Sequence, residues 1–150
     1  MININFQLSI INYLMRILAI DYGQKRTGLA VTDVLRITAN PLLTVDTAKL
    51  REWLSGELAK GEIDTVVIGH PTQLNGEDSA SMAYIRPFEQ WFRTQFPNIP
   101  LIPYDERFTS TLAHRAMTDG GMKKSARRDK AVVDKIAACI ILEDYLASCQ

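Results

Sequence analysis

Hydrophobic residues along the chain follow two periodicities, and each predicts a different kind of element. Short apolar runs rich in β-branched residues predict buried strands. We expect such strands over residues 16–21, 26–32, 63–69 and 99–104. A weaker run over residues 35–45 carries Pro41, which favours an edge strand or a break in a strand.

Apolar residues that recur at helical spacing predict four helices. The expected helices cover residues 47–60, 79–96, 111–117 and 130–147. Pro87 falls inside the second helix, so we expect a kink or a break there. The last helix is apolar nearly all round, and this pattern predicts that it is largely buried.

The expected order is three strands followed by alternating helices and strands, with two helices at the end. Such alternation predicts an α/β fold with a mostly parallel sheet and helices on its faces, and the opening hairpin adds antiparallel strands. The chain has 150 residues, which suits a single domain over residues 15–150. Residues 1–14 precede that domain as an extension, which is either an extra strand or arm or the product of an upstream start codon.

Composition excludes some classes of protein and leaves others open. The 17 Lys and Arg residues balance the 17 Asp and Glu residues, which argues against a generic polycation. A locally charged surface for nucleic acid stays possible. Cys139 and Cys149 resemble small hydrophobic residues more than a disulfide framework, which fits a reduced, cytoplasmic setting. No apolar run is long enough to span a membrane, and residues 1–14 lack the features of a signal peptide.

Three acidic residues occupy positions where functional sites form. Asp21 ends the first strand, and Glu106 follows the strand over residues 99–104. Sites in open α/β sheets form beyond the carboxyl ends of the strands. Asp134 lies on the face of the last helix that should pack inward. If that helix packs across the same end of the sheet, all three carboxylates converge.

Converging carboxylates repel one another and raise each other's pKa unless a cation lies between them. Mg²⁺ and Mn²⁺ prefer hard oxygen ligands and also accept phosphate oxygens. Two such ions, about 3.5–4 Å apart, activate a water molecule and stabilise the leaving oxygen of a phosphodiester. The three acids together therefore predict metal-assisted phosphodiester hydrolysis with two Mg²⁺ or Mn²⁺ ions.

Each acid alone also has a simpler interpretation. A strand-end Asp such as Asp21 is often a turn residue. Glu106 is next to Arg107, with which it could form an ion pair. Lys130 lies one helical turn before Asp134, and this local pairing competes directly with a metal site.

Basic residues gather near the predicted acidic site. A local run precedes Asp134 and suits contact with a phosphate backbone, although such runs are usually solvated loops. We assign nucleic-acid contacts to this run and to two further arginines: Lys123, Lys124, Arg127, Arg128, Lys130, Arg26 and Arg107. His70 and His114 have no evident catalytic partner, and we interpret them as structural.

Three separate segments resemble the YqgF family. They are DYGQKRTGLAVTD after the first strand, DERFTS after a later strand, and K-x-x-x-D-x-x-A-A over residues 130–138. The resemblance covers nearly everything from Met15 to the C-terminus. It implies an RNase H-like fold, with a mixed five-stranded sheet and helices on both faces. The acidic residues of the family correspond to Asp21, Glu106 and Asp134, which would be both catalytic residues and metal ligands.

Members of that family are described as pre-16S rRNA nucleases and as Holliday-junction-resolvase-like proteins. The resemblance therefore implies a metal-dependent endonuclease for structured RNA, acting in maturation of the 16S rRNA 5′ end, with precursor rRNA and ribosomal particles as partners. A resolvase of branched DNA is the alternative with the same chemistry, and it would favour a homodimer over a monomer. A non-catalytic RNA-binding module for ribosome assembly and an ATP-binding fold of the actin and hexokinase kind are further alternatives.

Overall fold

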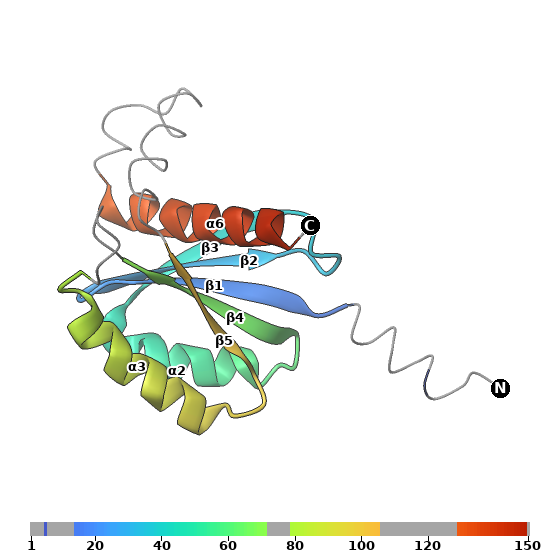
Figure 1. Cartoon of the computed structure of the whole chain (residues 1–150), viewed down its shortest axis with the longest axis horizontal. Coiled ribbons are helices and arrows are strands. Elements are labelled where there is room, and N and C mark those ends of the chain that lie inside the picture. Colours follow the sequence, from blue (N-terminus) through green and yellow to red (C-terminus); the bar gives the residue numbers. More distant parts are fainter. Residues whose placement is uncertain (1–4, 6–13, 72–78, 106–128, 150) are drawn as a thin grey trace.

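The computed structural model describes residues 5, 14–71, 79–105 and 129–149. They form a five-stranded sheet with helices on both faces (Figure 1). The strands are β1 (Arg16–Tyr22), β2 (Arg26–Thr32), β3 (Ala39–Asp46), β4 (Ile63–His70) and β5 (Leu101–Asp105). The helices are α2 (Thr47–Leu58), α3 (Met82–Gln95) and α6 (Lys130–Ser148). The helix expected over residues 111–117 lies outside the described residues.

The sheet is mixed, as the sequence predicts. Its strand order is β3-β2-β1-β4-β5. Strand β2 runs antiparallel to both β1 and β3, whereas β4 pairs parallel to β1 and β5 pairs parallel to β4. The carboxyl ends of β1, β4 and β5 therefore meet at one edge of the sheet, where α/β proteins form their functional sites.

Alternating side chains of β1 divide the core into two layers. Leu18 and Ile20 belong to the cluster that α2 and α3 complete on one face. Ile17 and Ala19 face the other way and pack with α6. Figure 1 shows this arrangement, with α6 on one side of the sheet and α2 and α3 on the opposite side. Because the alternation continues, Asp21 is on the α6 face.

The third strand begins later than the sequence predicts, because a tight turn occupies the first part of the expected run. The carboxylate of Asp33 accepts hydrogen bonds from the backbone N–H groups of Leu35, Ile37 and Thr38. Arg36 adopts a positive φ of 58° within this turn. Pairing with β2 can start only at Ala39, after the turn is complete.

Helix α3 continues through Pro87, so the expected break is absent. Proline removes one backbone hydrogen bond inside a helix and crowds the preceding turn. The opposing gain is burial of an aromatic face, since Phe88 and Phe92 are fully enclosed. Pro87 itself is exposed, which leaves that buried face intact.

Helix α6 packs closely on β2 and β3. A Cβ atom added at Gly28 of β2 would overlap the backbone carbonyl of Asp134, so only glycine allows this approach. The hydroxyl of Thr44 on β3 donates a hydrogen bond to the carbonyl of Ala131. The thiol of Cys139 donates to the carbonyl of Ala39 at 3.4 Å. These contacts fix the position of α6 along its length.

The sequence prediction that α6 is largely buried is only partly correct. Its buried residues gather in the middle of the helix: Ala137, Ala138, Cys139, Ile141 and Leu142. The flanking turns are partly exposed, because the described elements that contact α6 are strands on one side of it. The predicted inward face is confirmed, since it carries Ala137, Ala138 and Ile141 three, four and seven residues after Asp134.

The close packing at Gly28 gives a stability prediction. Gly28→Ala should lower the free energy of unfolding by about 1–3 kcal/mol, because backbone atoms of α6 must move to admit the methyl group. Gly56→Ala is a matched control, since Gly56 lies in α2 with nothing within 4 Å of an added Cβ. That control should gain about 0.5–1 kcal/mol from helix propensity. Urea denaturation measures both, and equal effects would contradict the packing argument.

Candidate active site

Asp21 and Asp134 converge at the edge of the sheet, although 113 positions separate them in the sequence. Asp21 is directly opposite Gly28 in the antiparallel pairing of β1 with β2, so both residues face α6. The backbone of Asp134 lies directly over Gly28. The glycine thus brings the helix that carries one carboxylate down beside the strand that carries the other.

The two carboxylates share an electrostatic environment. Burial raises the pKa of Asp21 to about 7, and the nearby charge of Asp134 adds to the shift. Burial also raises the pKa of Asp134, while Arg26 and Lys130 oppose that rise. Both groups are therefore harder to ionise than ordinary aspartates, and a cation between them would relieve the cost.

Arg26, at the start of β2, is the ion-pair partner of Asp134. Its Nε atom donates to Oδ2 of Asp134 at 3.2 Å. The local alternative, a pair between Lys130 and Asp134, is not formed among the described residues, and Lys130 acts only through its longer-range charge. The sequence suggested Arg26 as a phosphate contact but gave no signal for this pair, because no local spacing relates residues 108 positions apart.

The donor atoms suit a hard divalent cation. Two carboxylates meet on one face, and the side chain of Asp134 keeps 26% of its surface exposed, which leaves a route from solvent. Such oxygen donors are those that Mg²⁺ and Mn²⁺ prefer. The described residues contain no cluster of three or more His, Cys, Asp or Glu side chains that could hold a metal.

Several predicted site residues lie outside the described part of the chain. Glu106 directly follows Asp105, the last residue of β5. One histidine and most of the predicted nucleic-acid contacts also lie outside the described residues: His114, Arg107, Lys123, Lys124, Arg127 and Arg128. Lys130 is described and exposed, at the first turn of α6 beside the acidic pair.

His70 belongs to the opposite face of the sheet. Its Nε2 atom lies 3.0 Å from Oε1 of Glu89, a buried residue of α3. Arg93 completes this group through the second oxygen of Glu89 at 3.4 Å. This network ties β4 to α3 and supports a structural interpretation of His70.

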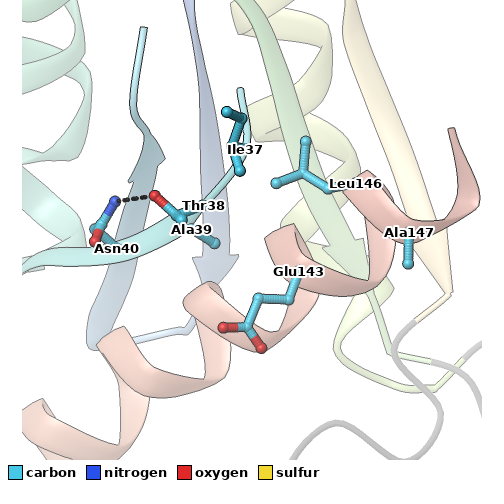
Figure 2. Close-up of a pocket in the computed structure, with 7 residues that line it drawn as sticks. All are labelled: Ile37, Thr38, Ala39, Asn40, Glu143, Leu146 and Ala147. Atoms are coloured by element: carbon cyan, nitrogen blue, oxygen red, sulfur yellow. Dashed lines mark hydrogen bonds between the residues drawn. The ribbon is translucent and has the colours of Figure 1, made fainter. Parts of the chain in front are cut away.

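A separate groove lies at the other end of the molecule. It has a volume of about 490 Å³ and is formed by the start of β3 and the end of α6. Figure 2 shows its lining: Ile37, Thr38, Ala39, Asn40, Glu143, Leu146 and Ala147. Glu143 is the one acid among the residues that line this groove. The pair formed by Asp21 of β1 and Asp134 of α6 is therefore the better candidate for chemistry.

The sheet order and the helices on its two faces form an RNase H-like fold. Two solved structures of Thermus thermophilus RuvC share the fold. One, at TM-score 0.55 and 18% identity, aligns over 90% of this chain and 97% of RuvC. The other, solved with a Holliday junction substrate, has TM-score 0.53 and 21% identity over 89% of this chain and 96% of RuvC. Identities this low establish the fold alone.

The chain belongs to the RuvX family, which is described as a Holliday junction resolvase family and matches residues 15–148. A relative from Phocaeicola vulgatus named "Putative pre-16S rRNA nuclease" is 53% identical, over 89% of this chain and 96% of the relative. A relative of the same name from Bacteroides thetaiotaomicron is 50% identical with the same coverage. The family is thus one of nucleases, which are hydrolases of phosphodiester bonds. Membership of this family takes the place of the ATP-binding fold that the sequence left open as an alternative.

None of the helices that the structure describes (α2, α3 and α6) is long and apolar enough to cross a bilayer.

The raised pKa of Asp21 predicts a pH-dependent effect on stability. In the metal-free protein, the unfolded state loses the Asp21 proton near pH 3.8 and the folded state only near pH 7. Ionisation therefore costs stability progressively across this range and fully above it. Asp21→Asn should therefore have a higher free energy of unfolding than wild type. This difference should grow by about 2–3 kcal/mol between about pH 5 and pH 8.

Chemical denaturation in the presence of a chelator measures this difference. Asp33→Asn provides the control, because turn hydrogen bonds lower the pKa of Asp33 and its carboxylate stays ionised at both pH values. The effect of that control should not change between them. A constant gain for Asp21→Asn would show that its pKa is not raised.

Proposed function

We propose that the protein is a metal-dependent endonuclease that hydrolyses phosphodiester bonds of structured RNA. The observation that carries this proposal is the convergence of Asp21 and Asp134 on one face of the sheet, where each acid is harder to ionise than usual. Glu106 directly follows β5, the second strand from β1 in the sheet, and is proposed as the third acid. All three would act as catalytic residues and metal ligands.

Each of these residues has a defined task in the proposed reaction. Asp21 and Asp134 hold Mg²⁺ or Mn²⁺, as two ions when Glu106 joins them. When bound by these residues, such ions would supply the positive charge that activates a water molecule and stabilises the leaving oxygen. The rigid strand β1 and the closely packed α6 keep the two carboxylates at a fixed separation, so the site is organised before substrate arrives.

Basic residues beside the acids would hold the phosphate backbone. Arg26 and Lys130 flank Asp134 in the structure, and Lys130 is exposed. Arg107, Lys123, Lys124, Arg127 and Arg128 are proposed to extend this surface. Contacts of this kind position a nucleic acid without reading its sequence, and they weaken as salt rises.

The names of the curated relatives favour RNA as the substrate. We therefore propose precursor rRNA, cut during maturation of the 16S rRNA 5′ end, in the cytoplasm and in contact with ribosomal particles. The description of the family favours a second candidate, resolution of branched DNA, because both substrates contain the same reacting group. A homodimer would support the second candidate, since a four-way junction is cut at two places.

Substitution of the three acids tests the catalytic proposal. Asp21→Asn, Glu106→Gln and Asp134→Asn should each reduce cleavage of a precursor rRNA fragment by at least about 10³-fold with Mg²⁺ or Mn²⁺. Circular dichroism should show an intact fold, because each change keeps the size of the side chain. His70→Gln provides a control on the opposite face and should keep most of the activity. Full activity in all three acidic variants would refute the proposal.

A competition experiment separates the two substrates. Unlabelled four-way DNA junction should compete poorly against labelled precursor rRNA if RNA is the substrate. Efficient competition, with paired cuts in the junction, would favour the resolvase. Tight RNA binding without cleavage under any divalent metal would instead favour a non-catalytic assembly module.

A further inference from the structure

Arg26 forms an ion pair with a residue of a distant helix and not with the acid on the strand beside it. In the register of β2 with β3 it is directly opposite Asp46, a carboxylate on the neighbouring strand. It nevertheless forms its ion pair with Asp134 on α6, through Nε at 3.2 Å. The guanidinium is therefore held at one of the two acids proposed to bind a metal ion.

We propose that Arg26 is an exchangeable counter-ion: it neutralises Asp134 in the metal-free protein, and it moves from Asp134 to a phosphate of the substrate when a divalent cation binds. This inference rests on the proposed nuclease function and assigns Arg26 a role within it. It makes Arg26 a competitor of the cation and, afterwards, a ligand of the nucleic acid.

The geometry of the pair supports an exchange. Arg26 holds Oδ2 of Asp134 through Nε, and the described residues supply no acceptor for its two terminal nitrogens. The Arg26 and Asp134 side chains keep 37% and 26% of their surfaces exposed, so the pair is open to solvent and can separate. A buried bidentate pair would be much harder to break.

Charge explains why Arg26 and a cation cannot occupy Asp134 together without cost. Both are positive, and both need the oxygen atoms of the same carboxylate. Lys130 is less suited to such competition, because it affects Asp134 only through longer-range charge. Once released, the planar guanidinium is well matched to a phosphate, which it can bind through two parallel hydrogen bonds.

Three possible roles of Arg26 predict different outcomes for Arg26→Gln. An exchangeable counter-ion predicts tighter metal binding together with slower cleavage. A purely structural ion pair predicts that both metal binding and cleavage weaken, because Asp134 loses its support. A simple nucleic-acid contact predicts slower cleavage with unchanged metal affinity.

A titration of the full chain with Mn²⁺ tests the proposal. Binding is measured by electron paramagnetic resonance at about pH 8.5, without nucleic acid. Arg26→Gln should bind Mn²⁺ about three- to tenfold more tightly than wild type, because a competing charge is gone. Arg26→Lys, which keeps the charge but lacks Nε, should show a smaller gain. Lys25→Gln removes an exposed charge from the adjacent turn and should leave the affinity unchanged.

Cleavage assays with the same variants complete the test. Arg26→Gln should cut precursor rRNA about ten- to hundredfold more slowly at saturating Mn²⁺, despite its tighter metal binding. Unchanged or weaker Mn²⁺ affinity in both Arg26 variants would overturn the inference, as would an equal gain in Lys25→Gln. If Asp134→Asn bound Mn²⁺ as tightly as wild type, the proposed function itself would fail, so the two failures are distinguishable.

Discussion

The contact between Gly28 and the backbone of Asp134 is the constraint on which the site depends. A strand residue with any side chain would hold α6 away from β2, because the first carbon would occupy the place of a helix carbonyl. Glycine removes that obstacle, and Thr44 and Cys139 then attach the same helix to β3. The position of Asp134 relative to Asp21 thus follows from packing of the backbone, which is stiffer than any side-chain contact.

This packing has an electrostatic cost that gives the site its character. Burial raises the pKa of both carboxyl groups, and the charge of Asp134 adds to the rise at Asp21. Arg26 offsets part of this cost at Asp134. At Asp21 both causes of the pKa shift, burial and the charge of Asp134, raise the pKa. A divalent cation between the two carboxylates would offset this cost.

The sequence predicts local structure well where one periodicity dominates. The sequence runs that correspond to β1, β2 and β4 are apolar on both faces of the strand. Their predicted bounds agree with the structure to within one residue. The start of β3 was wrong because Asp33 organises a turn through its side chain, which hydrophobic periodicity does not register. Of the kink or break predicted at Pro87, the break is absent, because burial of Phe88 and Phe92 outweighs the lost hydrogen bond.

The site shows the same division between local and long-range information. Asp21 and Asp134 could be selected from sequence because each is an acid at an informative place, one at a strand end and one on an inward helix face. The partner of Asp134 could not, because Arg26 and Lys130 are both plausible until α6 is placed on β2. Long-range pairs of this kind depend on the tertiary register, and here Gly28 sets it.

Substrate choice must come from residues around this site. Carboxylates that hold cations, and an arginine beside them, interact with phosphate groups, which RNA and DNA share. The described face around Asp21, Arg26 and Asp134 offers charges for a backbone, and Tyr104 of β5 lies on the same face of the sheet. The proposed reaction therefore depends on this site, and the choice between structured RNA and branched DNA would fall to the surrounding surface, through its shape and through the 2′-hydroxyl.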